Sequence, residues 1–355
     1  MEAKQELLLD LIATPDVRFA IPLYQRAYSW DELQCEELWR DALRAARGER
    51  EHFVGTVLHT EVVEPDGATV WYIVDGQQRI VTMTLLLLAL ASYMRDHDIA
   101  FYGMDADALL DTFVRAGGTG KLTPARVDQA TLAALVDGTA LPEHPSRHVV
   151  RNHAFFAERM ADESFDPELL WRGLRSLLAI RLCLDGDDNP QAVFESLNSK
   201  GIPLTTADLV RNYLLTAESR REQSRLYEEY WEPTQDAFGD DPGSLKLNTS
   251  IEAWLNVRCH SMHWDDDHTP FFVFKVYCED EYDGTVEDLL RELRGFAAMW
   301  AENFRYHAVK KYRTYDWALN GPKTLVSDRP LVKCEDEKVY EFYRKHYGIN
   351  PKATW

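Results

Sequence analysis

The residues that follow Gly76 constrain the fold more than any other part of the chain. From Gln77 to about Arg95 the sequence is rich in leucine and methionine and contains no glycine or proline, which predicts an uninterrupted helix. Its most apolar stretch, Ile80–Leu90, is shorter than the ~20 residues that a membrane-spanning helix requires. We therefore expect this helix to be buried inside a protein core.

The residues before this helix have the pattern of strands that lead into it. His52–Leu58 and Val70–Val74 are β-branched and aromatic runs separated by a Pro-Asp-Gly turn, which predicts two neighbouring strands. A short apolar run, Phe19–Ile21, predicts another strand, and the S-x-x-E pattern of residues 29–32 predicts that a helix starts at Ser29. The order strand, helix, strand, strand, helix predicts an α/β lobe.

Beyond about Asp105, helical patterns dominate. We predict long helices over Val149–Met160, Pro167–Leu184 and Val286–Tyr306. The fold class is therefore expected to be α+β, with an α/β lobe over residues 1–115 and a mainly helical lobe over 116–355. A glycine-rich stretch, residues 117–120, is the expected hinge between them.

Charge and cysteine content narrow the class of protein. The chain carries 59 acidic and 39 basic residues, a formal charge of −20, and such a surface repels DNA unless its basic groups are segregated. The five cysteines lie far apart without a CxxC pair, which argues against a disulfide framework. Without a secretory signal pattern, we expect a cytoplasmic protein that has no membrane contact.

The WYIVDGQQR segment, residues 71–79, combines groups that suit phosphate chemistry. A helix N-terminus attracts anions, and Gly76 lets a phosphate approach the backbone. Arg79 can bind phosphate oxygens, and Gln77 and Gln78 can orient water. Asp75 can hold Mg²⁺ or position a water nucleophile. Taken alone, the segment is more often a turn with a capping acid.

A second polar segment lies on the connection after the first predicted strand. Gln25 and Arg26 can also contact a phosphate, while Tyr24, Tyr28 and Trp30 can stack on a base or enclose an apolar pocket. In the alternative interpretation these aromatic rings belong to the core and Arg26 pairs with a surface acid.

Together, these segments resemble a known family. IPLYQRAYSW at 21–30, HFVGTV at 52–57, a strand running into DGQQR and then a leucine-rich helix occur in this order. A later match is VFESLNSKGIPL at 193–204, followed by DLVRN at 208–212. The chain resembles the N-terminal domain of GmrSD-type modification-dependent restriction enzymes, a domain type that also occurs in SspE-type, phosphorothioate-sensing defence proteins.

The resemblance implies a ParB/sulfiredoxin-like α/β lobe whose DGQQR motif supports nucleoside triphosphate hydrolysis. Asp75, Gly76, Gln77, Gln78 and Arg79 match that motif at every position. It also implies a C-terminal HNH-type nuclease domain as partner in the full-length protein, and nothing in this chain matches that domain. Nuclease activity is therefore not expected from this segment.

The third segment also has a physical interpretation. Thr205 as N-cap with Asp208 three residues later predicts a helix start, and the preceding loop can bring Asn198 and Lys200 to the nucleotide. In the alternative interpretation this loop only shapes the turn before the helix.

Basic and aromatic residues alternate between positions 303 and 323. This composition suits a nucleic-acid backbone with stacked bases, or else a solvated helix face with its aromatic rings in the core. The basic residues that we single out for DNA contact are Arg305, Lys310, Lys311 and Arg313.

The leading hypothesis is a GTPase-like sensor domain of an anti-phage restriction system that recognises modified DNA. Arg79, Gln78 and the helix N-terminus would hold the phosphates opposite Gln25 and Arg26, and Asp75 would bind Mg²⁺ or align the attacking water. The alternative is a non-catalytic module that binds modified DNA or a protein through a ParB-like lobe.

Overall fold

The structure, a computed structural model, describes residues 2–48, 52–65, 67–184, 193, 204–216, 219–239, 245–259 and 269–311. The chain divides into two compact units, unit 1 (Met1–Lys200) and unit 2 (Gly201–Trp355).

Unit 1 combines strands and helices. Its strands are β1 (Glu2–Leu7), β2 (Val17–Ala20), β3 (His52–Val63), β4 (Thr69–Asp75), β5 (Arg115–Ala116), β6 (Thr119–Gly120), β7 (Leu122–Thr123) and β8 (Leu177–Leu184). Its helices are α1 (Leu8–Ile12), α2 (Glu32–Arg47), α3 (Gln77–Asp96), α4 (Ala106–Phe113), α5 (Arg126–Asp137), α6 (Arg147–Met160) and α7 (Pro167–Leu174). The predicted α+β class is confirmed.

Six strands form one mixed sheet in the order β1-β8-β3-β4-β2-β7. β2 and β4 are parallel neighbours, so both end at the same edge of the sheet. β3 runs antiparallel to β4 and places Leu58 opposite Asp75. The first residues of β3 therefore lie beside the end of β4, where the DGQQR segment begins.

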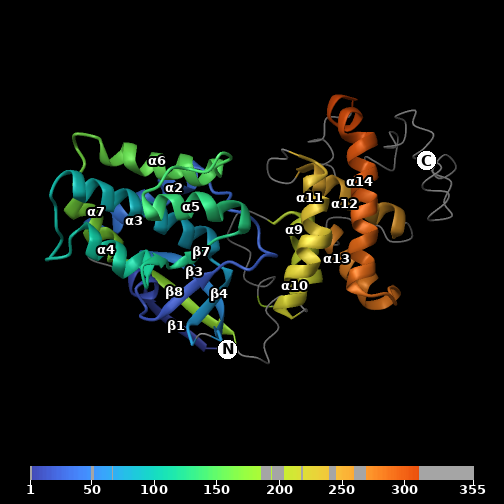
Figure 1. Cartoon of the computed structure of the whole chain (residues 1–355), viewed down its shortest axis with the longest axis horizontal. Coiled ribbons are helices and arrows are strands. Elements are labelled where there is room, and N and C mark those ends of the chain that lie inside the picture. The colour runs from blue at the N-terminus through green and yellow to red at the C-terminus, as the bar shows by residue number, and fades with distance from the viewer. Residues whose placement is uncertain are drawn as a thin grey trace. The chain divides into compact units, whose positions relative to one another are not determined.

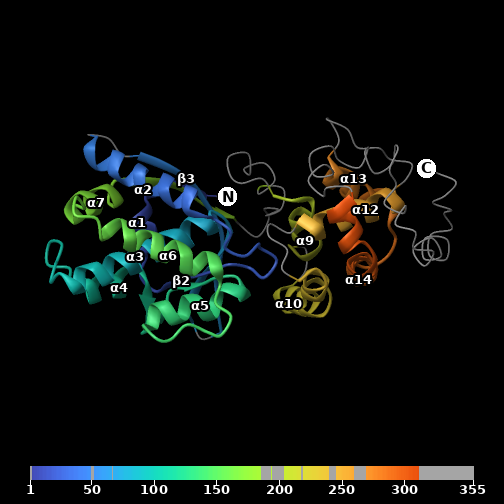
Figure 2. The ribbon, with the colours of Figure 1, turned by 90° about the horizontal axis from the view of Figure 1, so that it is seen from above.

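The predicted central helix is present as α3. Fifteen of its twenty residues are buried, and none from Gln77 to Ala91 is exposed, so this part of the helix has no solvent-facing side and must be enclosed by the rest of unit 1. Figures 1 and 2 show α3 covered by α6, with the helices of unit 1 gathered on one side of the sheet. The core joins α3 to the sheet through Phe19, Val57, Trp71 and Ile73.

The sequence prediction of a helix over Pro167–Leu184 is wrong in its second half. The helix ends at Leu174, and Leu177–Leu184 form strand β8. LLAIRLCL is leucine-rich and suits either structure, and its position between β1 and β3 offers hydrogen-bond partners on both of its edges.

The boundary between the units also differs from the predicted one. Unit 1 continues to residue 200 because β7 and β8 belong to the same sheet as β1 to β4. The glycine-rich stretch predicted as a hinge forms the hairpin of β5 and β6 inside unit 1. The position of helix α2 is a smaller correction: its N-cap is Asp31, not Ser29.

Every element described in unit 2 is helical. The α-helices are α9 (Thr206–Thr216), α10 (Arg220–Leu226), α11 (Glu232–Asp236), α12 (Leu245–Arg258), α13 (Pro270–Val276) and α14 (Val286–Lys311), with π-helical turns at Tyr227–Trp231 and Tyr277–Glu281. The predicted start of α9 is confirmed: Asp208 N donates to Thr205 Oγ1 over 3.1 Å, and Thr205 N donates to Asp208 Oδ2 over 3.2 Å.

Among the described helices, none is both long enough and apolar enough to cross a membrane.

Candidate functional site

The DGQQR segment lies where β4 turns into α3. Asp75 is the last residue of the strand, Gly76 adopts a left-handed conformation with φ 88°, and Gln77 begins the helix. A Cβ atom on Gly76 would lie 2.8 Å from the Thr56 carbonyl oxygen. Glycine is therefore required here both by its backbone conformation and by the close approach of β3.

Arg79 packs against the beginning of β3. Its Nη1 donates a hydrogen bond to the Thr56 carbonyl over 2.9 Å. Beside it, Gly55 has φ +114°, and a Cβ atom there would lie 2.5 Å from Arg79 Nη2. Burial lowers the pKa of Arg79, and the charge of Asp75 opposes this shift. Gly55 thus provides the space that this guanidinium group occupies.

Asp75 is partly buried beside two guanidinium groups. Burial raises the pKa of its carboxyl group, while the backbone N–H of Gly76 and the charges of Arg79 and Arg26 lower it. The effect of burial is the largest, and the pKa is raised overall. Ionising this carboxyl group therefore costs more in the folded protein than in water, which is common at functional sites.

The loop after β2 brings the second polar segment to the same place. Gln25 Nε2 donates to the Val74 carbonyl over 3.1 Å, and Gln25 Oε1 accepts from Gln77 Nε2 over 3.1 Å. The two sequence motifs are therefore adjacent, because parallel β2 and β4 end at the same edge of the sheet. Gln77 Oε1 is buried and has no hydrogen-bond partner.

Gln78 holds the loop rather than facing an open site. Its Oε1 accepts from Ser29 N over 2.8 Å and from Trp30 N over 3.2 Å, and its Nε2 donates to the Ala27 carbonyl over 3.1 Å. Both ends of the carboxamide are thus used for backbone contacts. A role for Gln78 in orienting water stays a prediction, and the geometry gives it a positioning role.

The aromatic residues of the loop point largely inward. Tyr24 and Tyr28 are buried, and Trp30 is partly buried against the core. The Tyr28 hydroxyl lies 2.7 Å from Thr82 Oγ1 and accepts from Asn152 Nδ2 over 2.8 Å. The interpretation of Tyr28 as a core residue therefore describes the structure better than stacking on a base.

Several predicted contacts fall beyond what the structure describes. Asn198, Lys200 and Arg313 lie outside the described residues. Arg305, Lys310 and Lys311 belong to α14, of which only the backbone is described from residue 303 onward. Their proposed contacts with nucleotide and DNA stay predictions.

The N-terminus of α3 is suited to an anion. It has no side-chain cap and no acidic residue in its first turn. The first intrahelical hydrogen bond runs from Ile80 N to the Gly76 carbonyl over 3.1 Å, so the N–H groups of Gln77, Gln78 and Arg79 precede it. Arg79 adds a positive charge in the same turn, and Asp75 directly before the helix adds a carboxyl group that interacts with it.

Asp75 does not belong to a ready-made metal site. In the part of the chain that the structure describes, no three His, Cys, Asp or Glu side chains are grouped to hold an ion. One carboxylate is nevertheless enough for Mg²⁺ when substrate phosphates and water supply the remaining ligands.

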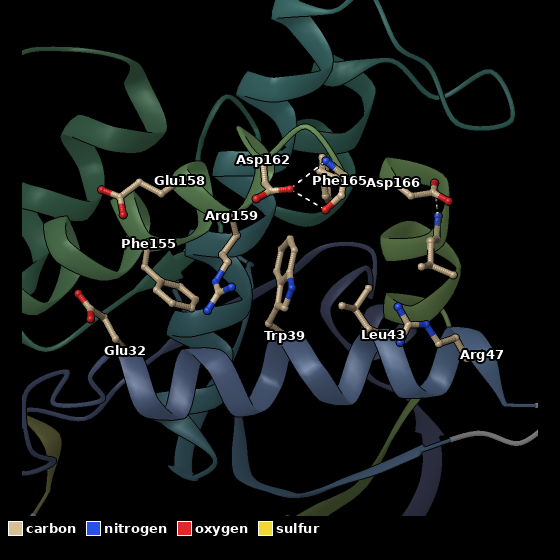
Figure 3. Close-up of a pocket in the computed structure, with 12 residues that line it drawn as sticks. Glu32, Trp39, Leu43, Arg47, Phe155, Glu158, Arg159, Asp162, Phe165 and Asp166 are labelled. Atoms are coloured by element: carbon tan, nitrogen blue, oxygen red, sulfur yellow. Dashed lines mark hydrogen bonds between the residues drawn. The ribbon is translucent and has the colours of Figure 1, made fainter.

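A separate hollow of about 540 Å³ lies along α2, on the helical side of unit 1. Figure 3 shows Trp39 standing between Arg159 and Leu43, with Phe155 at one end of the hollow and Asp166 at the other. None of the DGQQR residues lines it. It therefore has no part in the chemistry at the end of β4.

A buried histidine on β3 was not singled out from the sequence. His59 is fully buried, stacks on Trp71 with ring centroids 4.2 Å apart, and its Nε2 lies 3.5 Å from Arg181 Nη1. Burial, followed by the charge of Arg181, lowers its pKa to about 4. The imidazole is therefore neutral at neutral pH.

Some residues that shape the site carried little signal in the sequence. The glycine in the middle of the HFVGTV strand pattern was a usable clue to close packing at Gly55. Thr56 contributes through its backbone carbonyl, and Asp128 lies 100 positions away from the loop residue that it binds. No local pattern predicts such contacts.

Comparison with known proteins identifies one family. The family described as GmrSD restriction endonuclease, N-terminal domain, matches residues 8–215, which is more than half of the chain. The matched region runs from α1 through β8 to α9. No curated protein matches the sequence.

Proposed function

The chain belongs to the GmrSD restriction endonuclease N-terminal domain family and is thus a component of a restriction system; from this premise we propose that it hydrolyses nucleoside triphosphates at the end of β4. The main support is the N-terminus of α3, which has no side-chain cap, has Arg79 in its first turn and has Asp75 directly before it.

The phosphates would bind at the first turn of α3. The N–H groups of Gln77, Gln78 and Arg79 offer hydrogen-bond donors, and the guanidinium groups of Arg79 and Arg26 stabilise negative charge. Phosphoryl transfer is accelerated mainly by this kind of positioning and electrostatic stabilisation. Gln25 and Gln77 are buried, and their hydrogen bonds fix the loop that carries Arg26.

Asp75 is the carboxylate that we assign to Mg²⁺. The ion would neutralise phosphate charge when bound with the nucleotide. Burial raises the pKa of Asp75, and the charges of Arg79 and Arg26 oppose this shift; a bound cation would favour the ionised carboxylate in the same direction. GTP is the first nucleotide to test, in line with the GTPase-like activity expected from the sequence.

The test is phosphate release from GTP, ATP, CTP and UTP with Mg²⁺, by wild type and by Asp75→Ala and Arg79→Ala. We expect each substitution to lower turnover by about a hundredfold or more. Asp107→Ala and Arg95→Ala are matched controls, since these residues form an exposed ion pair with N···O 2.9 Å. Turnover that is unchanged in both site variants, with both proteins folded, would overturn the catalytic assignment.

A non-catalytic nucleotide-binding or partner-binding module is the second candidate. It is favoured by the engagement of Gln78, whose carboxamide is fully used for contacts with the loop backbone. Nucleotide binding in calorimetry without turnover by the wild-type protein would support this candidate and exclude the first.

Recognition of modified DNA, such as phosphorothioate DNA, and coupling to a C-terminal HNH nuclease domain complete the proposal. Hydrolysis would report or reset the sensing event. DNA recognition is tested by measuring binding of this chain and of the full-length protein to modified and unmodified duplexes. We expect salt-sensitive binding to the modified duplexes alone.

A further inference from the structure

The loop between β2 and α2 has no regular structure, yet buried side chains hold five of its backbone groups. Gln78 binds the Ala27 carbonyl and the N–H groups of Ser29 and Trp30. The Tyr28 N–H donates to Asp128 Oδ2 over 2.8 Å, and the Trp30 carbonyl accepts from Asn152 Nδ2 over 2.8 Å. Three helices, α3, α5 and α6, thus grip one short segment, residues 27–30.

Burial of the Asp128 carboxylate is energetically unfavourable. It lies in the first turn of α5, only 1% exposed, and burying a carboxylate is costly unless its oxygens are fully bonded. One oxygen holds the Tyr28 N–H, and the other accepts from Ser146 Oγ over 2.6 Å. Ser146 N in turn donates to Thr131 Oγ1 over 2.8 Å, so α5 and the start of α6 are tied to the same carboxylate.

Asn152 makes a second connection from α6. It is fully buried, and its Nδ2 is shared between the Tyr28 hydroxyl and the Trp30 carbonyl. The Tyr28 hydroxyl also contacts Thr82 on α3 at 2.7 Å. Because α3 begins at the DGQQR segment, these contacts connect α5 and α6 to the helix whose N-terminus forms the proposed phosphate site.

We propose that Asp128 and Asn152 are positioning residues that fix loop 27–30, and with it Gln25 and Arg26, against the end of β4. The inference rests on the proposed hydrolysis for its kinetic readout but not for its structural one. Gln25 already bonds Val74 and Gln77, so the loop is held on both sides of Arg26. Release of one side would let the guanidinium group move away from Asp75.

Amide hydrogen exchange of the loop tests the contact without any nucleotide. In Asp128→Asn the new Nδ2 can donate to the Ser146 hydroxyl, and the amide oxygen is left for the Tyr28 N–H. This oxygen is uncharged, so the bond that holds the loop is weaker than the one to a carboxylate. We expect exchange of the peptide covering residues 21–31 to become at least about tenfold faster. Gln129→Ala is the control, because Gln129 lies on the same helix as Asp128 and its side chain donates to the Pro124 carbonyl over 3.1 Å. This variant should leave the exchange rate of the loop unchanged.

Kinetics separates positioning from general destabilisation. Loss of folded protein lowers kcat with KM unchanged, and does so equally in an Arg26→Ala background. Positioning through the loop instead lowers kcat/KM of the folded enzyme by about tenfold, and this loss disappears when Arg26→Ala is already present. The double variant Arg26→Ala/Asp128→Asn should therefore be no slower than Arg26→Ala alone.

Asn152→Asp is the second variant, and it places an acceptor against the Trp30 carbonyl. Its loop exchange and its kinetics are measured as for Asp128→Asn, and they test the inference if Asp128→Asn does not fold. Unchanged exchange of the loop in the folded variant, or additive losses with Arg26→Ala, would overturn the inference. A wild-type protein that hydrolyses no nucleotide overturns the proposed function instead, while the exchange experiment still tests the hold on the loop.

Discussion

The guanidinium group of Arg79 lies so close to Gly55 that a methyl group on that glycine would come within 2.5 Å of Arg79 Nη2. The residues are 24 positions apart in the sequence, one in the strand motif HFVGTV and the other in DGQQR. The strand must therefore lack a side chain at the position where the arginine lies.

Gly55→Ala should therefore weaken both stability and activity. The methyl group would force Arg79 or the strand to move, and the residue would also be strained at φ +114°, at a cost of about 1–3 kcal/mol. The measurements are chemical denaturation and nucleotide turnover. Gly118→Ala is the control, since Gly118 has φ +82° with nothing within 4 Å of its added Cβ; equal turnover losses in both variants would contradict the steric explanation.

Asp75→Asn should increase stability while lowering turnover. The pKa of Asp75 is raised in the folded protein, so the unfolded chain ionises at lower pH and folding loses stability as pH rises through the folded pKa. The neutral amide removes this loss at neutral pH. Melting temperatures from pH 4 to 8 should show a variant advantage that shrinks toward acid pH, whereas exposed Asp107→Asn should show none.

The buried His59 should make the protein less stable in mild acid. Its pKa is about 4 in the folded state against an ordinary 6.5. Between pH 4 and pH 6.5, His59 is therefore protonated in the unfolded chain and neutral in the folded protein. Stability is fully present above the ordinary value and is lost as pH falls toward the folded one, by at most about 3 kcal/mol. His59→Gln should flatten this dependence in denaturation curves, and exposed His144→Gln should not.

Gln78 should be more sensitive to alanine than to glutamate. Alanine leaves the N–H groups of Ser29 and Trp30 and the Ala27 carbonyl without their partner, which costs about 3 kcal/mol. Glutamate can still accept from both N–H groups but cannot donate to the Ala27 carbonyl. Unfolding free energies in the order wild type, Gln78→Glu, Gln78→Ala are expected, and equal values for the two variants would argue against the hold on the loop.

The sequence predicted elements whose signals are local. The buried α3 helix, the turn at Gly76 and the capping box of Thr205 and Asp208 depend on neighbouring residues, and each is present as predicted. The sequence hypothesis placed Gln25 and Arg26 opposite Arg79 and Gln78. In the structure Gln25 contacts Gln77, because β2 and β4 are parallel neighbours that end at the same edge of the sheet.

The contacts that sequence reasoning missed depend on distant partners. β8 was mistaken for a helix since only its neighbours β1 and β3 decide its conformation. Serine is a common N-cap residue, which is why Ser29 was expected to begin the helix. Gln78 and Asn152 instead bind the backbone of Ser29 and Trp30, and the helix starts after Asp31. Gln78 was expected to face the ligand, and only the folded loop shows that its amide is occupied.

The strand order has a consequence for synthesis on the ribosome. β8 lies between β1 and β3, so the first strand of the chain finds its place in the sheet only after residue 184 has been made. Until then, the growing chain carries a free edge on β3 beside the segment that forms the site, and such edges invite pairing with other chains. A gene fragment that stops before β8 should therefore yield aggregated rather than folded protein.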